Sequence, residues 1–508
     1  MAESSDPAPA ALPDMAEIEQ AWQREDFVFV RRGLERLARE TGSALAQYRY
    51  GRVLLEGRGG PTEIDEAADW LQKAVDQNHA PAATLLAKLY LSNLDRDGPI
   101  KLQRDPARAV DLLELAAALG LAEGQYELSR LYSAGLGVER DDKAAFRWLL
   151  AAAGQQHVKA QFALALAYSS GRGTKEDVAQ TIEWLTVAGE NGYVPAQYAL
   201  GRTYARGESV PQDPEQAVTW FTRAAEAGLP AAQRQLGGIY LTGQGVAQDV
   251  AAGVGWLEKA AKGQDVEAMV ILARAYATGQ GVARDDAAAA KWYARADQFG
   301  YGGATLALAA MYEVGRGVAQ DFDRALELYQ KALSLPGGEK AAVLLGQMAV
   351  RGKLEGRFAP HRMVPWGLAA LQNGDTEAQP WLQAQARAGL REAQAGLAAH
   401  YLNIPERAAE GAEFLELAAR SGDPEAQQRL GRMYMTGEHV ALDYVAAHSW
   451  FNIAATLGRG EAIELRATVA ALMTPEQVAE AQARARDWFA SEEPQPPATE
   501  QSVREVNQ

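Results

Sequence analysis

The sequence predicts an all-α protein, a right-handed superhelical solenoid of about eleven helical hairpins, each near 36 residues long. Two observations predict it. One is a set of tyrosines spaced 36 residues apart: Tyr132, Tyr168, Tyr204, Tyr240, Tyr276 and Tyr312. The other is that glycines, aspartates and tryptophans keep the same step, as in Gly135, Gly171 and Gly207, or Asp141, Asp177 and Asp213, or Trp148, Trp184 and Trp220. Several residue types that stay in phase over six copies indicate an internal repeat.

Residues 195–228 show how one unit folds. Leu200 and Tyr204 lie four residues apart, on one face of a first helix. Gly207 is placed to end that helix, because a left-handed residue there needs no Cβ. Asp213 is placed to cap a second helix. The apolar stripe of that helix comprises Ala217, Trp220, Phe221, Ala224 and Ala225.

A single hairpin of this kind cannot bury its apolar side, so it must stack on the next. We therefore expect the repeated tryptophan to form core between hairpins and Gly201 to allow close helix approach. The tryptophan place reads Trp70, Leu112, Trp148, Trp184, Trp220, Trp256, Trp292, Leu328, Trp381, Phe414 and Trp450. The repeated aspartates are expected to be caps, since acids a whole repeat apart cannot share a cation.

The repeat pattern sets the predicted organisation of the chain. The expected parts are a disordered tail (1–14), N-terminal capping helices (15–40), the repeat array (41–458), C-terminal capping helices (459–490) and a disordered acidic tail (491–508). The step from Tyr90 to Tyr132 is 42 residues and the step from Ala349 to Tyr401 is 52, which predicts insertions near 93–104 and within 353–375. Trp22 and Trp488 are expected to pack in the two caps.

The unit AQYALGRTYARG, followed by Asp213 and WFTRAAEAG, resembles the Sel1-like repeat, a relative of the tetratricopeptide repeat. The resemblance covers about four-fifths of the chain. It implies a bacterial adaptor that binds other proteins and assembles complexes. Residues 471–489 are similar to the C-terminal capping helix of bacterial members. The competing function is a structural subunit of a cell-envelope or exopolysaccharide secretion complex.

Composition narrows the function classes. The chain has 508 residues, a formal net charge of −16 and no cysteine. It therefore has no disulfide and no thiolate nucleophile or metal ligand. Its acidity argues against nucleic acid as a partner. No apolar run is long enough to span a membrane.

The N-terminus, MAESSDPAPAALPD, has no signal-peptide pattern, so the chain as given is expected in the cytoplasm. A periplasmic location is the alternative if the true start lies upstream. No catalytic motif is present, and Gly-x-Gly pairs such as Gly135 and Gly137 follow helices rather than strands. We expect no enzyme activity, no cofactor and no metal site.

A first candidate partner site follows one helix position. The residue after the first-helix glycine place is basic in six of eleven repeats: Arg52, Lys88, Arg130, Arg202, Arg274 and Arg432. If first helices line the inner groove, these side chains form a basic stripe that suits an acidic peptide of a protein partner. The alternative is that each pairs with an acid of the adjacent repeat.

A second candidate partner site is the insertion within 353–375. It is basic and aromatic in an acidic chain, with Arg357, Phe358, Arg362 and Trp366 as the candidate contacts. The alternative is a folded-back plug that covers an irregularity in the solenoid. Shortening the insertion to the regular repeat length would separate the two interpretations.

Overall fold

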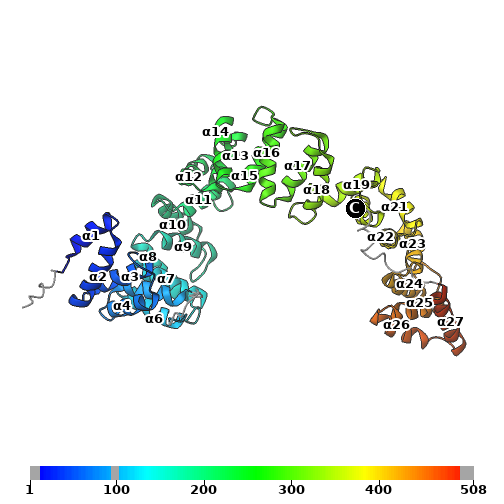
Figure 1. Ribbon diagram of the computed structural model, residues 1–508, viewed down its shortest axis with the longest axis horizontal. Helices are drawn as coiled ribbons and strands as arrows, with labels where there is room; N and C mark the ends of the chain where they lie inside the picture. The colour runs from blue at the N-terminus through cyan, green and yellow to red at the C-terminus, as the bar shows by residue number, and fades with distance from the viewer. Residues whose placement is uncertain (1–11, 93–101, 492–508) are drawn as a thin grey trace, which may run out of the picture. The chain divides into compact units, whose positions relative to one another are not determined.

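The computed structural model describes residues 12–92 and 102–491 (Figure 1). Within these ranges the chain forms 27 α-helices and one 3-10 helix, and no strand. The all-α prediction is confirmed. The predicted tails and the extension near 93–104 lie mostly outside the described residues.

The chain divides into two compact units, Met1–Ala268 and Met269–Gln508. The helices of the first unit are α1 (Met15–Gln23), α2 (Phe27–Thr41), α3 (Ala44–Glu56), α4 (Ile64–Val75), α5 (Ala80–Leu91), α6 (Pro106–Ala118), α7 (Ala122–Ala134), α8 (Asp142–Gly154), α9 (Val158–Ser170), α10 (Val178–Glu190), α11 (Val194–Arg206), α12 (Pro214–Glu226), α13 (Pro230–Thr242) and α14 (Val250–Lys262). From α3 to α14 they pack in consecutive pairs, and each pair packs on the next. Helix α15 (Val266–Thr278) begins in this unit and ends in the second.

The second unit continues the same pattern of paired helices. Its helices are α16 (Asp286–Gln298), α17 (Gly302–Val314), α18 (Phe322–Ala332), α19 (Lys340–Val350), α20 (Pro360–Gln372), α21 (Ala378–Arg387), α22 (Arg391–Leu402), η1 (Pro405–Arg407), α23 (Ala408–Arg420), α24 (Pro424–Thr436), α25 (Tyr444–Thr456), α26 (Gly460–Ala470) and α27 (Pro475–Ser491). Helix α17 pairs with α18, α19 with α20, α22 with α23, and α24 with α25. Helices α26 and α27 both pack on α25.

The repeated aspartate caps the second helix of its hairpin, as predicted. The Asp213 carboxylate accepts a hydrogen bond from the backbone N–H of Gln216 at 3.0 Å. The same cap forms at Asp105, Asp141, Asp177, Asp249, Asp285, Asp321 and Asp443. Such a cap satisfies a helix N–H that otherwise has no partner within the helix.

The tryptophan and the residue after it connect a second helix to its two neighbours. Trp220 is 6% exposed, and it packs with Leu185 of α10 and Leu200 of α11. Phe221 is 1% exposed and packs forward with Leu236 of α13. Trp70 is buried as well, and other members of the tryptophan place pack against the core while partly buried: Trp148, Trp184, Trp256 and Trp450. The expected core position is thus confirmed for Trp70 and Trp220 and holds in part for these four. The position after Trp220, which the sequence pattern did not single out, is buried as well.

Gly201 allows this close packing. A Cβ on Gly201 would lie 2.6 Å from Cδ1 of Phe221, well inside van der Waals contact. The same closeness occurs between Gly237 and Leu257, where the gap would be 2.7 Å. The predicted close approach of the two helices of one hairpin is confirmed.

In six hairpins a buried glutamine joins the hairpin to the helix before it, a feature that the sequence reasoning missed. The Gln197 Nε2 donates a hydrogen bond to the backbone carbonyl of Gly189, at the end of the preceding helix, at 2.9 Å. The same bond is made by Gln125, Gln161, Gln233, Gln394 and Gln427. It satisfies one of the last carbonyls of a helix, which have no partner inside that helix.

We expect Ala227→Asn to stabilise the protein by about 1 kcal/mol, the usual net value of one hydrogen bond. In the preceding repeat, Asn191 Nδ2 donates to Gln161 Oε1 at 3.1 Å. Gln197 Oε1 is buried and has no partner among the described residues, and Ala227 occupies the position equivalent to Asn191. Urea unfolding measures the gain. In a Gln197→Leu background the gain should vanish; a gain that persists would contradict this account.

The ninth repeat differs from the prediction. Helix α20 lies within 353–375 and packs on α19 as a regular second helix. Gly346 and Trp366 are 20 residues apart, the same step as Gly201 and Phe221. The helix without a counterpart in the regular repeats is α21, which packs between α20 and α22. The extra residues are therefore a complete helix that follows the predicted insertion.

The reason for this error is a duplicated pattern. Trp381 is followed at once by an apolar residue, Leu382, and eight residues later by Gly389. Trp220 has the same neighbours in a regular repeat, Phe221 and Gly228. Because of this shared pattern, Trp381 was predicted to hold the tryptophan place of the ninth repeat. In the structure Trp381 belongs to the added helix α21.

Candidate functional site

A groove runs along the first helices of successive repeats in the first unit. One depression of about 1180 Å³ is lined by α5, α7 and α9. A second, of about 380 Å³, is lined by α9, α11 and the start of α10. The two share Leu166 and Ser169, so they form one continuous surface, which we call the first-helix groove.

Three members of the predicted basic stripe line this groove: Lys88 on α5, Arg130 on α7 and Arg202 on α11. They occupy the same repeat position, so the stacking of hairpins brings residues 42 or 72 apart in sequence onto one surface. Counting Arg172, the larger depression has three basic side chains against one acid, Glu127. This part of the groove is therefore positive in a chain of net charge −16.

Ion pairs position part of this charge. The Lys88 ammonium binds the Glu123 carboxylate and lies 3.4 Å from Glu127. Arg130 pairs with Glu127 at 2.8 Å along its own helix. Partial burial opposes the charged form of Lys88, but its hydrogen bonds to the two glutamates outweigh this and raise its pKa. Lys88 therefore carries its charge at neutral pH.

Arg202 differs from Lys88 and Arg130. Among the described residues it forms no ion pair, and its guanidinium lies 6.0 Å from the ring centroid of Tyr198, one turn earlier on α11. An exposed guanidinium without a carboxylate partner can bind one from another molecule, and its planar fork suits that geometry.

The groove also has an apolar centre. Leu166, on α9, occupies the same repeat position as Arg130 and Arg202, and it is 50% exposed. Leu136, Leu149 and Ala163 also line the larger depression. Leu166 is therefore an apolar contact between the positions of Arg130 and Arg202. The smaller depression also carries three acids in its lining: Glu176, Asp177 and Glu208.

The other stripe members lie elsewhere. Arg52 pairs with Glu56 at 2.7 Å and lines a separate pocket of about 230 Å³ beside Trp22. Arg274, on α15, is exposed, and Arg432 binds Glu461 of α26; both belong to the second unit. The structure thus gathers three of the six predicted residues in one groove.

The alternative interpretation, in which each basic stripe residue pairs with an acid of the adjacent repeat, is correct for two of the six residues. Lys88 and Arg432 each bind an acid of the following helix pair. Arg52 and Arg130 pair within their own helices instead.

The second candidate site packs against the protein itself. Trp366 is 9% exposed, and its ring meets Phe358 edge-on at a centroid distance of 5.3 Å. Arg357 binds Asp323 of α18, and its guanidinium lies 5.1 Å from the Phe322 ring. Trp366 is therefore core and not accessible to a partner, which corrects that part of the prediction.

Arg357 and Arg362 are exposed, and Phe358 is half-buried. The Arg362 guanidinium covers Phe358, 5.4 Å from its ring centroid. These contacts favour the packing interpretation of this segment over partner contact.

Within residues 12–92 and 102–491, no three His, Asp or Glu side chains gather in a way that would hold a metal ion. None of the helices there is both long enough and apolar enough to cross a bilayer.

The repeat unit was compared with known protein families. A model of the Sel1 repeat matches nine segments that together exceed half of the chain: 44–79, 80–121, 122–157, 158–193, 194–229, 230–265, 266–296, 303–336 and 424–458. The chain belongs to the Sel1 repeat family. The segments matched as Sel1 repeats include all the helices that line the first-helix groove. The region with the added helix α21 is not matched.

Solved structures of Sel1 repeat proteins are similar to this one. A protective antigen of uropathogenic Escherichia coli strains with an SLR fold is 26% identical, with a TM-score of 0.56 over 93% of this chain and 94% of that one. A Sel1 repeat protein from Oxalobacter formigenes is 25% identical, with a TM-score of 0.43 over 82% of this chain and 91% of that one. A search of curated proteins gave no match.

Proposed function

We propose that this Sel1 repeat protein acts by binding rather than by catalysis, holding a segment of a protein partner in the first-helix groove. Sel1 repeat proteins generally mediate protein–protein interactions. The segment carries carboxylate side chains on either side of an apolar residue. The observation that carries this proposal is that Lys88 and Arg130 precede the exposed Leu166, and Arg202 follows it, along one continuous surface.

The proposed contacts follow from the groove's chemistry. The apolar residue of the partner covers Leu166 and removes its exposed surface from water, which is favourable. One carboxylate pairs with Arg202, which has no ion pair to give up among the described residues. A second approaches Arg130, whose side chain is 62% exposed although its partner Glu127 is largely buried.

Photo-crosslinking from position 166 tests this proposal. The protein with a benzophenone side chain in place of Leu166 is irradiated in extract from its source, and the attached peptide is identified by mass spectrometry. The same group in place of Leu150, an exposed leucine on α8 outside the groove lining, is the matched control. We expect a partner peptide that carries Asp or Glu near an apolar residue, captured from position 166 and not from 150.

Charge reversal makes the test specific. Arg130→Glu with Arg202→Glu should abolish the crosslink, and Arg147→Glu, on the second helix of the same hairpin as Arg130, should leave it intact. A crosslink that survives the double reversal, or a captured peptide without acidic residues, would overturn the proposal.

A further inference from the structure

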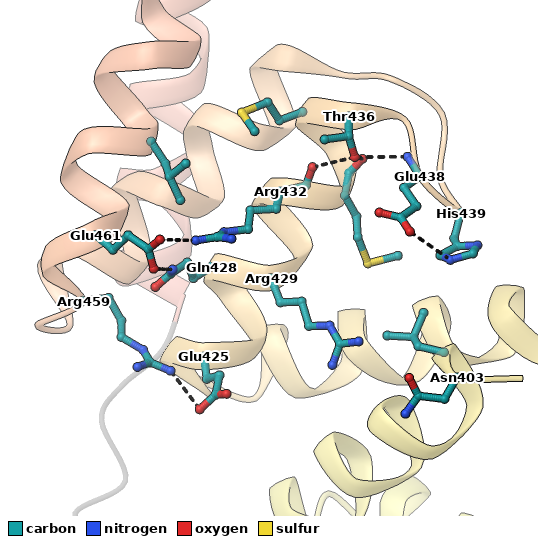
Figure 2. A pocket seen from close by; sticks show the side chains of 14 residues that line it. Asn403, Glu425, Gln428, Arg429, Arg432, Thr436, Glu438, His439, Arg459 and Glu461 are labelled. Carbon is teal, nitrogen blue, oxygen red and sulfur yellow. Dashed lines mark hydrogen bonds and ion pairs between the residues drawn. The ribbon is translucent and has the colours of Figure 1, made fainter.

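A second polar pocket lies in the second unit, apart from the first-helix groove (Figure 2). It encloses about 920 Å³ between the end of α22, helix α24, the loop after α24 and the start of α26. Its charged side chains include three arginines, Arg429, Arg432 and Arg459, and three glutamates, Glu425, Glu438 and Glu461.

The shape of this pocket follows from two local changes in the repeat. The preceding hairpin has a short connection, in which η1 joins α22 to α23. In regular repeats, the second glycine of the turn abuts the preceding hairpin; a Cβ on Gly173 would lie 2.0 Å from the carbonyl oxygen of Asp142. The last repeat has His439 at that place, with a φ of 60°. A side chain is accommodated there, so the loop does not make the regular close contact.

Most charges in the pocket have partners. Glu461 binds Arg432 and accepts a hydrogen bond from Gln428 Nε2 at 2.6 Å. Arg459 pairs with Glu425 at 2.9 Å. These two pairs neutralise two arginines and two glutamates, and Figure 2 shows them together on one side of the pocket.

Arg429 is the arginine left over. It is exposed and forms no ion pair or hydrogen bond with the described residues. Figure 2 shows its guanidinium extending from α24 toward Asn403, away from the two paired arginines. Leu402 and Met433 supply apolar lining nearby. Glu438, the third glutamate of the lining, lies 3.6 Å from His439 Nε2 and is not paired with Arg429. The pocket thus offers an unpaired guanidinium fork, an amide and apolar surface.

We infer that this pocket binds an acidic peptide segment, with a Glu or Asp carboxylate seated on Arg429. A guanidinium binds a carboxylate through two parallel hydrogen bonds, and the Asn403 amide can donate a third. The volume of about 920 Å³ is at the upper end of the range for ligand pockets, so it is large enough for a short peptide segment. This site is independent of the groove proposed above.

The test uses a fluorescein-labelled peptide of six glutamates and its six-glutamine counterpart, with binding measured by fluorescence anisotropy at low salt. We expect Arg429→Ala to weaken binding of the glutamate peptide about 10-fold, the loss of one charge-assisted contact. Arg420→Ala is the matched control, because Arg420 is an exposed arginine of the neighbouring α23 outside the pocket lining. It should change binding less than about 2-fold.

Further measurements separate this pocket from the first-helix groove, and an acidic peptide from a small carboxylate. The double reversal Arg130→Glu with Arg202→Glu should leave the Arg429-dependent binding unchanged, so failure of the groove proposal does not affect this one. Equal binding of the two peptides, or an Arg429→Ala variant that binds like wild type, would overturn the inference. Free glutarate that displaces the peptide completely and binds as tightly as the peptide does would also overturn the inference, in favour of a small carboxylate.

Discussion

Replacing Trp220 by alanine is expected to lower the free energy of unfolding by about 3–5 kcal/mol, the usual range for a buried aromatic side chain. The ring packs with the preceding hairpin, and the Gly189 position of α10 faces its Cζ3. Truncation leaves a cavity between two hairpins that the rigid helices cannot fill. Urea unfolding followed by circular dichroism measures the loss.

The matched control is Leu166→Ala, an apolar truncation at a position that is half exposed. It should change stability by less than about 0.5 kcal/mol, because little buried surface is lost. Hydrogen exchange should locate the Trp220 effect in α10 to α12. If both variants lose similar stability, the tryptophan place is not the core between hairpins.

Replacing Gly173 by alanine is expected to destabilise the protein by about 2–4 kcal/mol, from backbone strain and steric overlap together. Gly173 has a φ of 74°, which a residue with a Cβ adopts at a cost. The new Cβ would also lie 2.0 Å from the backbone oxygen of Asp142, at the start of the preceding hairpin's second helix. Backbone cannot move aside as a side chain can, so the two hairpins must separate.

Gly192→Ala separates the two causes. Gly192 has a φ of 81°, but nothing lies within 4 Å of a Cβ there. It should lose only the strain component, about 1 kcal/mol. The difference in thermal stability between the variants then measures the contact between hairpins. Equal losses would show that the turn does not fix the spacing of neighbouring repeats.

Most of the fold could be predicted because its determinants are local and repeated. Asp213 needs only the helix that follows it, so its cap is visible in the sequence. Gly201 and the tryptophan place repeat with the hairpin, so their packing could be inferred from spacing. The buried Gln197 was missed, although it recurs, because its partner is a backbone carbonyl and leaves no mark in the sequence.

Helix α21 was misplaced for a different reason. Its Trp381 and Leu382 repeat the pattern of a second helix, so a pattern match cannot tell a regular helix from an added one. Only packing shows that α20 pairs with α19 and that α21 is the addition.

The candidate sites were predicted less completely than the fold. Position within the repeat was enough to select Lys88, Arg130 and Arg202, which share a groove. It could not show that Leu166 supplies an apolar centre, or that Trp366 is buried by Phe358. Arg429 was missed because it does not lie at the repeat position of the basic stripe. It has no carboxylate partner because Arg432 and Arg459 bind the nearby glutamates, which only the structure shows.

The central claim is that the first-helix groove binds an acidic segment of a partner through Arg130, Arg202 and Leu166. Its most direct test is isothermal titration of the full chain with the partner peptide found by crosslinking. The account predicts that Arg130→Glu with Arg202→Glu weakens binding at least about 10-fold, while Arg147→Glu changes it less than about 2-fold. Equal affinity for wild type and the double variant would contradict it.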